Sequence, residues 1–145
     1  RNLIELKQDI LKMREKMLDV HPNPTPLFDI KHDRGGIIDV EFIVQYLVLG
    51  YASQFPQLTG NIGNIALLKL AGELGLVPAE LATQVRTAYR EYRRLQHRFR
   101  LGGEPELTSA PLSKDKSEKF ARIAADHLSN DRLSVLQLWD AVFRL

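Results

Sequence analysis

Apolar residues recur at alternating steps of three and four through the first segment of the chain, which is the spacing of one face of an α-helix. The positions of this stripe are Leu3, Leu6, Ile10, Met13, Met17 and Val20. The segment 21–26 that follows has three prolines within five residues, and it cannot continue the helix because proline lacks the necessary N–H. The pattern predicts an amphipathic helix followed by a proline-rich linker.

Similar patterns, separated by glycine and proline, predict further helices along the rest of the chain. They cover residues 37–52, 61–74, 78–101, 114–128 and 132–143. Gly75 suits a C-terminal cap, and Pro78 suits the first turn of the next helix. We expect a short extended piece at 28–31, a loop at 104–113 and a break at 129–130. The predicted fold class is therefore all-α, a helical bundle of about five to six helices with short loops.

We interpret residues 1–145 as a single helical domain. Its parts are the first helix and linker at 1–27, a central part at 28–101 and C-terminal helices at 102–145. The 145 residues, of which 44% are hydrophobic, suffice for one core. Because the sequence begins inside a helical pattern and without methionine, we expect it to be a segment of a longer protein.

Composition excludes several kinds of site. The absence of cysteine rules out disulfides, zinc–thiolate sites and cysteine nucleophiles, and it fits a cytoplasmic location. The four histidines show no metal-ligand spacing, so we predict no metal site in this chain. A net charge of +2 is too small to indicate nucleic acid as a partner. The apolar runs fall far short of the ~20 residues of a membrane-spanning helix, so we expect no membrane partner.

The charged turn, residues 28–41, is the most informative feature of the sequence, because its acids, bases and two glycines lead directly into an apolar run. Gly35 and Gly36 permit a tight backbone turn. Two glycines before a helix can also bind phosphate through free backbone N–H groups. Neither a GxGxxG pattern nor a P-loop pattern is present, and the nearby acids would repel phosphate, so this indication is weak.

The helix after the charged turn carries polar residues among apolar ones. Asp39 and Glu41 diverge by about 200° on a helix, whereas Glu41 and Gln45 share a face. Their neighbours are apolar nearly all the way round, which predicts a helix that is buried on most sides. We therefore expect Glu41 and Gln45 to be covered.

A buried Glu41 would need a partner, because an unpaired buried carboxylate costs several kcal/mol. Lys31, Arg34, a cation or a group from another domain would serve. In a structural interpretation, Asp33 or Asp39 caps the helix and Glu41 closes a salt bridge. In a functional interpretation, the buried polar groups belong to a site. The residues alone leave both interpretations open.

One face of the helix predicted at 78–101 is strongly basic. The arginine stripe consists of Arg86, Arg90, Arg93, His97 and Arg100, spaced 4, 3, 4 and 3 residues apart. Such a stripe is typical of a solvated face on a core helix. It is equally consistent with a docking face for an acidic partner or for phosphates. Nucleic acid is a less favoured partner because no recognition motif accompanies the stripe.

The charged turn resembles a signature of glutamine synthetase adenylyltransferases, large bifunctional enzymes that attach AMP to glutamine synthetase and remove it again. The matching residues are Asp29-Ile30-Lys31, Gly35-Gly36-Ile37, Asp39-Val40-Glu41-Phe42-Ile43 and Gln45. The likeness continues through Tyr46-Leu47-Val48-Leu49, Pro56-Gln57-Leu58-Thr59, Asn64, Ala88-Tyr89 and residues 92–98. It covers about residues 12–101 and then fades.

This resemblance implies an enzyme with two nucleotidyltransferase halves, each with a catalytic domain followed by a helical domain. The form Asp29-Ile30-Lys31 resembles the second half, which adenylylates. The family's catalytic domain carries a Gly-Ser and an Asp-x-Asp pair that holds magnesium, and this chain has no such motif. The chain thus resembles the C-terminal helical domain without its catalytic domain. Mg²⁺ and ATP would belong to the parent enzyme, and we expect this chain alone to bind neither.

By the same resemblance, the charged turn lies where the helical domain meets the nucleotidyltransferase domain. The candidate cleft-facing or domain-junction residues are Asp29, Lys31, Gly35, Gly36, Asp39, Glu41 and Gln45. In the parent enzyme, magnesium carboxylates would align ATP for attack by a tyrosine hydroxyl of glutamine synthetase.

Three functions follow as hypotheses. The first is a helical accessory domain of an adenylyltransferase that transfers no AMP by itself. The second is an interaction module that docks glutamine synthetase or the nitrogen-signalling PII protein through the arginine stripe. The third is a free-standing helical regulator unrelated to nucleotidyl transfer.

Overall fold

Five α-helices and a two-stranded sheet make up the described part of the chain, residues 2–101, 122–124 and 126–144 of a computed structural model. The elements are α1 (Leu3–Val20), β1 (Phe28–Asp29), α2 (Ile37–Tyr51), the 3₁₀-helix η1 (Pro56–Thr59), α3 (Asn64–Glu73), α4 (Ala79–Arg100), β2 (Arg122–Ile123) and α6 (Ser129–Phe143). The predicted all-α bundle is confirmed. None of these helices is both long enough and apolar enough to cross a membrane.

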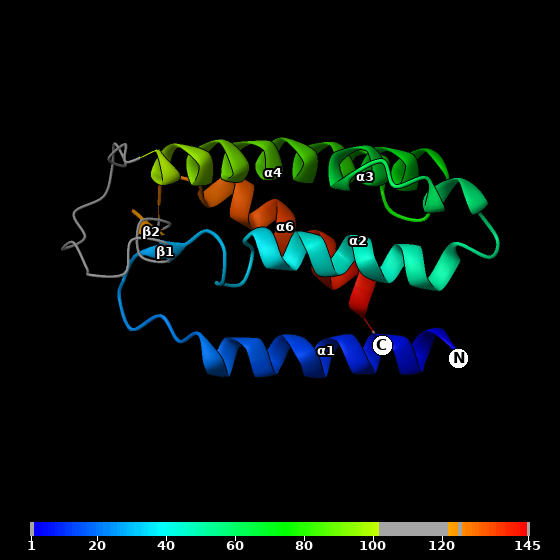
Figure 1. Cartoon of the computed structure of the whole chain (residues 1–145), viewed down its shortest axis with the longest axis horizontal. Coiled ribbons are helices and arrows are strands. Elements are labelled where there is room, and N and C mark those ends of the chain that lie inside the picture. Colours follow the sequence, from blue (N-terminus) through cyan, green and yellow to red (C-terminus); the bar gives the residue numbers. More distant parts are fainter. Residues whose placement is uncertain (1, 102–121, 125, 145) are drawn as a thin grey trace.

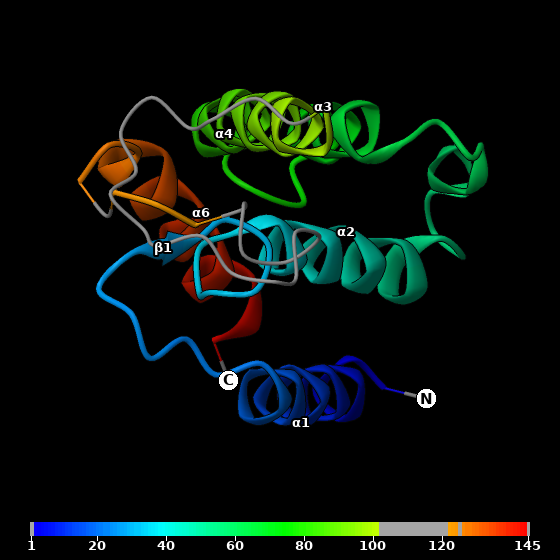
Figure 2. The ribbon, with the colours of Figure 1, turned by 60° about the vertical axis from the view of Figure 1, so that its left-hand side comes forward.

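Helix α2 lies at the centre of the bundle. Helix α1 runs along one side of it, α3 and α4 lie along the opposite side, and α6 crosses behind (Figure 1). The same order is visible from a second direction (Figure 2). This position explains why α2 is the most apolar helix of the described chain, since it packs against α1, α3, α4 and α6.

Local sequence signals explain where several helices begin and end. The Asn2 side chain caps α1 by accepting a hydrogen bond from the Glu5 backbone N–H at 2.8 Å. Gly75 adopts a φ of +76° after α3, as expected for a C-terminal cap. The third predicted helix was placed too early, because Asn61 and Gly63 have φ values of +54° and +83°. The positive φ of these two residues interrupts the helical conformation, and α3 begins at Asn64.

The prediction of helix at 114–128 is wrong over its last part. Strand β2 pairs antiparallel with β1, and a turn follows it to Leu128. The pairing with β1 buries Ile123, so long-range contacts override the local helical pattern. The break expected at 129–130 is also wrong, because α6 begins at Ser129. Residues 114–121 and the loop expected at 104–113 lie outside the described residues.

Candidate functional site

The charged turn is organised around the carboxylate of Asp39, which lies in the first turn of α2 and is fully buried. Its Oδ1 accepts a hydrogen bond from Arg14 Nε at 2.5 Å. Its Oδ2 accepts one from Arg34 Nε at 3.0 Å and one from the Gly35 backbone N–H at 2.7 Å. Two guanidinium groups and a backbone amide therefore satisfy a buried charge that would otherwise be costly.

The buried carboxylate is thus Asp39, and the expectation that Glu41 and Gln45 are covered is wrong. Both side chains are exposed, and neither makes a hydrogen bond to a described residue. The physical reason is that the helices around α2 leave one stripe of it open. Glu41, Gln45 and Leu49 follow one another at steps of four along this stripe, and Leu49 is 61% exposed. Arg34 therefore pairs with Asp39 and not with Glu41.

The double glycine forms a turn whose backbone amides are already used. The N–H of Gly35 donates to Asp39, and that of Gly36 donates to the Asp33 carbonyl at 3.0 Å. The next N–H, of Ile37, donates to the Ile30 carbonyl at 2.7 Å. A phosphate would have to break these bonds, so the turn does not have the free amides of a phosphate-binding loop.

Gly36 is required by close approach rather than by its φ. A Cβ atom at this position would lie 2.5 Å from the Ile30 carbonyl oxygen, which is backbone and cannot move away easily. Gly35 has a φ of +86°, and the hydroxyl of Tyr92 donates to its carbonyl at 2.8 Å. Tyr92 thereby connects α4 to the charged turn.

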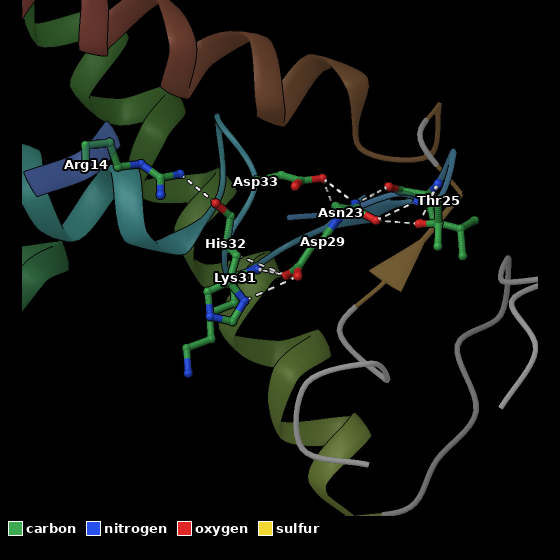
Figure 3. A network of polar contacts seen from close by, with 8 residues as sticks. Arg14, Asn23, Thr25, Asp29, Lys31, His32 and Asp33 are labelled. Carbon is green, nitrogen blue, oxygen red and sulfur yellow. Dashed lines mark hydrogen bonds and ion pairs between the residues drawn. The ribbon is translucent and has the colours of Figure 1, made fainter. Parts of the chain in front are cut away.

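A second network fixes the first half of the charged turn (Figure 3). The Asp29 Oδ1 accepts hydrogen bonds from the backbone N–H groups of Lys31 and His32, both at 3.0 Å. The Asp33 Oδ2 accepts the Asp29 N–H at 3.0 Å and the Asn23 side-chain amide at 2.8 Å. Asp29 and Asp33 therefore hold backbone geometry, which is a structural task.

The carboxyl of Asp29 is itself stabilised in its charged form. Burial alone would raise the pKa of Asp29. The His32 side chain, at 3.3 Å from Nδ1 to Oδ2, together with the backbone N–H groups of His32 and Lys31, outweighs burial and lowers the pKa below its ordinary value. The His32 ring also stacks on His21 with centroids 4.1 Å apart.

Lys31 differs from its neighbours because its side chain is not used in the turn. The ammonium group extends away from the network and makes no hydrogen bond or ion pair with a described residue (Figure 3). Its backbone, by contrast, is fixed on both sides, since the N–H donates to Asp29 and the carbonyl accepts the Ile38 N–H at 3.2 Å. Lys31 therefore has a backbone held by hydrogen bonds and a positively charged side chain that has no partner among the described residues.

Arg14 is the member of the site that the sequence did not reveal. It lies on the buried stripe of α1 with Leu6 and Ile10, and it is only 2% exposed. The predicted stripe included Met13 and Val20 instead, which are 44% and 71% exposed. The available signal was the step of four from Leu6 through Ile10 to position 14, where an arginine replaces the expected apolar residue.

Residues of the C-terminal helix α6 contact the charged turn. Arg132 Nε donates to the Arg34 carbonyl at 2.9 Å, and its guanidinium lies over the Phe28 ring at 4.5 Å. The Arg34 guanidinium lies over the Trp139 ring at 4.7 Å. The charged turn is therefore held by α1, α2, α4 and α6 together.

The arginine stripe lies mostly on the surface of α4, as its spacing predicts. Arg90, Arg93, His97 and Arg100 are exposed, and Arg86 is half-buried. Arg93 Nη1 donates to the Gln96 side chain at 2.7 Å. The stripe and the charged turn belong to different elements, and no hydrogen bond or ion pair joins them among the described residues.

Acidic groups border the stripe on its α6 side, in a groove of about 470 Å³ that Arg90 helps to line. Glu91 pairs with Arg94 at 2.7 Å, which lowers the pKa of Glu91. Burial, followed by repulsion from Glu91, raises the pKa of Asp131. The basic surface is therefore broken on this side by two carboxyl groups.

Comparison with known proteins adds to this geometry. The family described as GlnD PII-uridylyltransferase matches the chain over residues 5–144. The chain belongs to this family. The resemblance was expected to fade after Leu101, but it continues almost to the C-terminus.

Among curated members of the family, the chain is 69% identical over 143 residues to a "Bifunctional glutamine synthetase adenylyltransferase/adenylyl-removing enzyme" of Nitrosomonas europaea. Proteins of the same name from Nitrosomonas eutropha and Aromatoleum aromaticum are 66% and 48% identical. Each match covers 99% of this chain. The chain spans only about 15% of the length of these relatives. The resemblance to glutamine synthetase adenylyltransferases is thereby confirmed.

The charged turn does not fit the magnesium site that the family resemblance implies for the parent enzyme. Both carboxylate oxygens of Asp29 and of Asp39 already accept hydrogen bonds or an ion pair, from the turn itself or from Arg14 in α1. Within the described ranges, no group of three histidine or acidic side chains is placed to hold a metal ion. Within the described residues, the candidate side chains without a hydrogen-bond partner are those of Lys31, Glu41 and Gln45, and a single carboxylate among them is not a set that Mg²⁺ prefers.

Proposed function

We propose that this chain is the C-terminal helical domain of a glutamine synthetase adenylyltransferase. In that role it supports the transfer of AMP from ATP to a tyrosine of glutamine synthetase without carrying the catalytic Asp-x-Asp pair. The observation that supports this most strongly is that some polar side chains of the charged turn have all their partners within this domain and others have none among the described residues. The Asp39 carboxylate is buried and both of its oxygens accept hydrogen bonds, whereas the side chains of Lys31 and Glu41 have no partner in the described chain.

In this proposal the nucleotidyltransferase domain of the same protein covers the open stripe of α2. Lys31 would face the phosphates of ATP, because a free ammonium group on a rigid backbone suits a polyanion. Glu41 and Gln45 would pair with groups of the neighbouring domain. Magnesium would be held outside this chain, since the turn has no free pair of carboxylates. The role of the remaining candidates would be to hold the backbone of the charged turn in place; these are Asp29, Gly35, Gly36 and Asp39.

Glu41→Ala in the full-length protein tests this proposal. The loss of one charged contact at the domain junction should lower the rate of AMP transfer to glutamine synthetase by about tenfold. Because Glu41 is exposed in this domain, thermal unfolding should hardly change. Glu15→Ala on the exposed face of α1 is the matched control. A wild-type rate for Glu41→Ala would contradict the proposal, as would AMP transfer by the isolated chain.

A second candidate function is docking of glutamine synthetase or the PII protein through the arginine stripe. The supporting observation is that Arg90, Arg93 and Arg100 are exposed on one helix face. Exposed cations of this kind attract acidic partners and mainly raise association rates. The family membership leaves the third hypothesis, a regulator unrelated to nucleotidyl transfer, without support.

Charge reversal tests the docking function. The double variant Arg90→Glu, Arg93→Glu in the full-length protein should weaken capture of the acidic partner by about tenfold at low salt, because each reversal replaces attraction by repulsion. Lys12→Glu, Lys16→Glu on the exposed face of α1 is the control with the same change of charge. Equal capture of glutamine synthetase and PII by both double variants would exclude the stripe as a docking surface.

A further inference from the structure

We propose that Arg14, which lies outside the charged turn, is a positioning residue that aims Lys31 at the nucleotide. This inference rests on the proposed function, because it assumes that Lys31 faces ATP. It goes beyond that function because it assigns the orientation of the Lys31 side chain to a residue of α1, which lies outside the signature of the family. The buried guanidinium of Arg14 acts through the backbone and does not reach the substrate itself.

The geometry of Arg14 carries the inference. Its Nη2 donates to the His32 carbonyl at 2.7 Å, one residue after Lys31. Its Nε binds Asp39 Oδ1 at 2.5 Å, at the start of α2. Arg14 therefore links α1 both to His32, which follows β1, and to Asp39, which lies in α2. Without this tie the His32 carbonyl loses its hydrogen bond from Arg14, which loosens the residue that follows Lys31. The Lys31 backbone keeps its own bonds to Asp29 and Ile38.

Packing alone does not explain an arginine at this position. Leu6 and Ile10 precede it on the same buried stripe, so an apolar side chain would fit the stripe as well. The Nη1 of Arg14 is buried and has no hydrogen-bond partner within the described part of the chain, which is a cost that an apolar residue avoids.

The surroundings also make the variant Arg14→Met testable. Asp39 would keep Arg34 and the Gly35 N–H as partners at Oδ2, so its charge would stay paired, while its Oδ1 would lose the hydrogen bond from Arg14. Methionine has a similar length and an adaptable shape, which limits the cavity that the substitution leaves. Arg14→Lys is a second variant that retains a positive charge but lacks the fork that reaches two acceptors at once.

A double-mutant cycle in the full-length protein tests the inference. Steady-state AMP transfer to glutamine synthetase is measured for the wild type, Arg14→Met, Lys31→Met and the double variant. Each single variant should raise the KM for ATP by about tenfold, and the double variant should raise it no further, because Arg14 acts through Lys31. The KM for glutamine synthetase should stay unchanged, and Arg14→Lys should show a smaller rise. A loss of folded protein alone would lower kcat without moving either KM.

The control is Lys7→Met, which removes a tie between α1 and α6 that does not touch the charged turn. Lys7 Nζ donates to the Arg144 carbonyl at 3.1 Å. The KM of the Lys7→Met variant for ATP should match that of the wild type. An unchanged KM for Arg14→Met and Arg14→Lys beside a raised KM for Lys31→Met would overturn the inference and leave the proposed function intact. Additive effects of Arg14→Met and Lys31→Met would overturn it too. An unchanged KM for Lys31→Met would overturn the proposed role of Lys31 itself.

Discussion

Asp39 shows how one residue can decide the geometry of a whole turn. Its carboxylate is excluded from water and satisfied by Arg14, Arg34 and the Gly35 N–H. Removing one partner from such a buried ion pair typically costs about 3–5 kcal/mol, which is a large part of the stability of a small domain. Because two cations share the carboxylate, Asp39 itself should be less replaceable than either arginine.

At the same scale, Asp29 should make stability depend on pH in the acid range. The pKa of Asp29 is lowered from its ordinary value of 3.8, so the folded state favours the charged form. The resulting stabilisation is present above the ordinary value and is lost as the pH falls through the lowered pKa. In urea unfolding, the stability advantage of the wild type over Asp29→Asn should therefore shrink below about pH 4.

The exposed carboxylate of Asp19 on α1 provides the control for that titration. The difference between the wild type and Asp19→Asn should be small at every pH. A stability difference between the wild type and Asp29→Asn that stays constant from neutral to acid pH would show that the charge of Asp29 does not stabilise the turn.

At the scale of elements, α6 packs directly against the charged turn. A Cβ atom added at Gly35 would lie 2.6 Å from Arg132 Cγ and 3.2 Å from Leu136 Cγ, both in α6. The substitution Gly35→Ala should thus destabilise the domain through both its φ of +86° and this overlap, by about 2–4 kcal/mol together. The midpoint of thermal unfolding measures the effect.

Gly63 offers a matched control for this prediction. Its φ of +83° is nearly the same as that of Gly35, but nothing lies within 4 Å of an added Cβ atom. Gly63→Ala should therefore show the backbone penalty alone, about 1–3 kcal/mol, because its φ of 83° and ψ of 164° lie in a region essentially restricted to glycine. Equal destabilisation by the two substitutions would mean that contact with α6 does not constrain the turn.

The sequence predicted the elements well where the determining signals are local. Periodicity placed α1 and α4 within a few residues of their observed ends because both are amphipathic, and the glycine pair before Ile37 marked the start of α2. It failed at β2, where pairing with a strand far away in the sequence decides the structure. It also failed for Glu41, since the apolar surroundings of α2 do not reveal which side its neighbours leave open.

The candidate site was predictable only in part for the same reason. The charged turn stood out through its composition, and the resemblance identified its family. Arg14 escaped notice, because the step of four from Ile10 places it on the buried stripe but does not show that a buried acid faces it. The assignment required the packing of α1 against α2.

At the scale of the whole molecule, the open stripe of α2 is the feature that most needs an explanation. On this otherwise well-buried central helix, Leu49 is 61% exposed and lies in line with the exposed Glu41 and Gln45. The relatives of this chain are several times longer, since it spans about 15% of their length. A neighbouring domain of the same protein is therefore the cover that we propose.

Thiol labelling of Gln45→Cys in the full-length protein tests this central claim most directly. The chain has no cysteine of its own, so the new thiol is unique within it and can be followed by peptide mass spectrometry. Lys12→Cys on the outer face of α1 is the reference, since both positions are exposed in this domain. We predict that the thiol at position 45 reacts at least about tenfold more slowly than the thiol at position 12, because a packed junction restricts access. Equal labelling rates at the two positions would contradict the account.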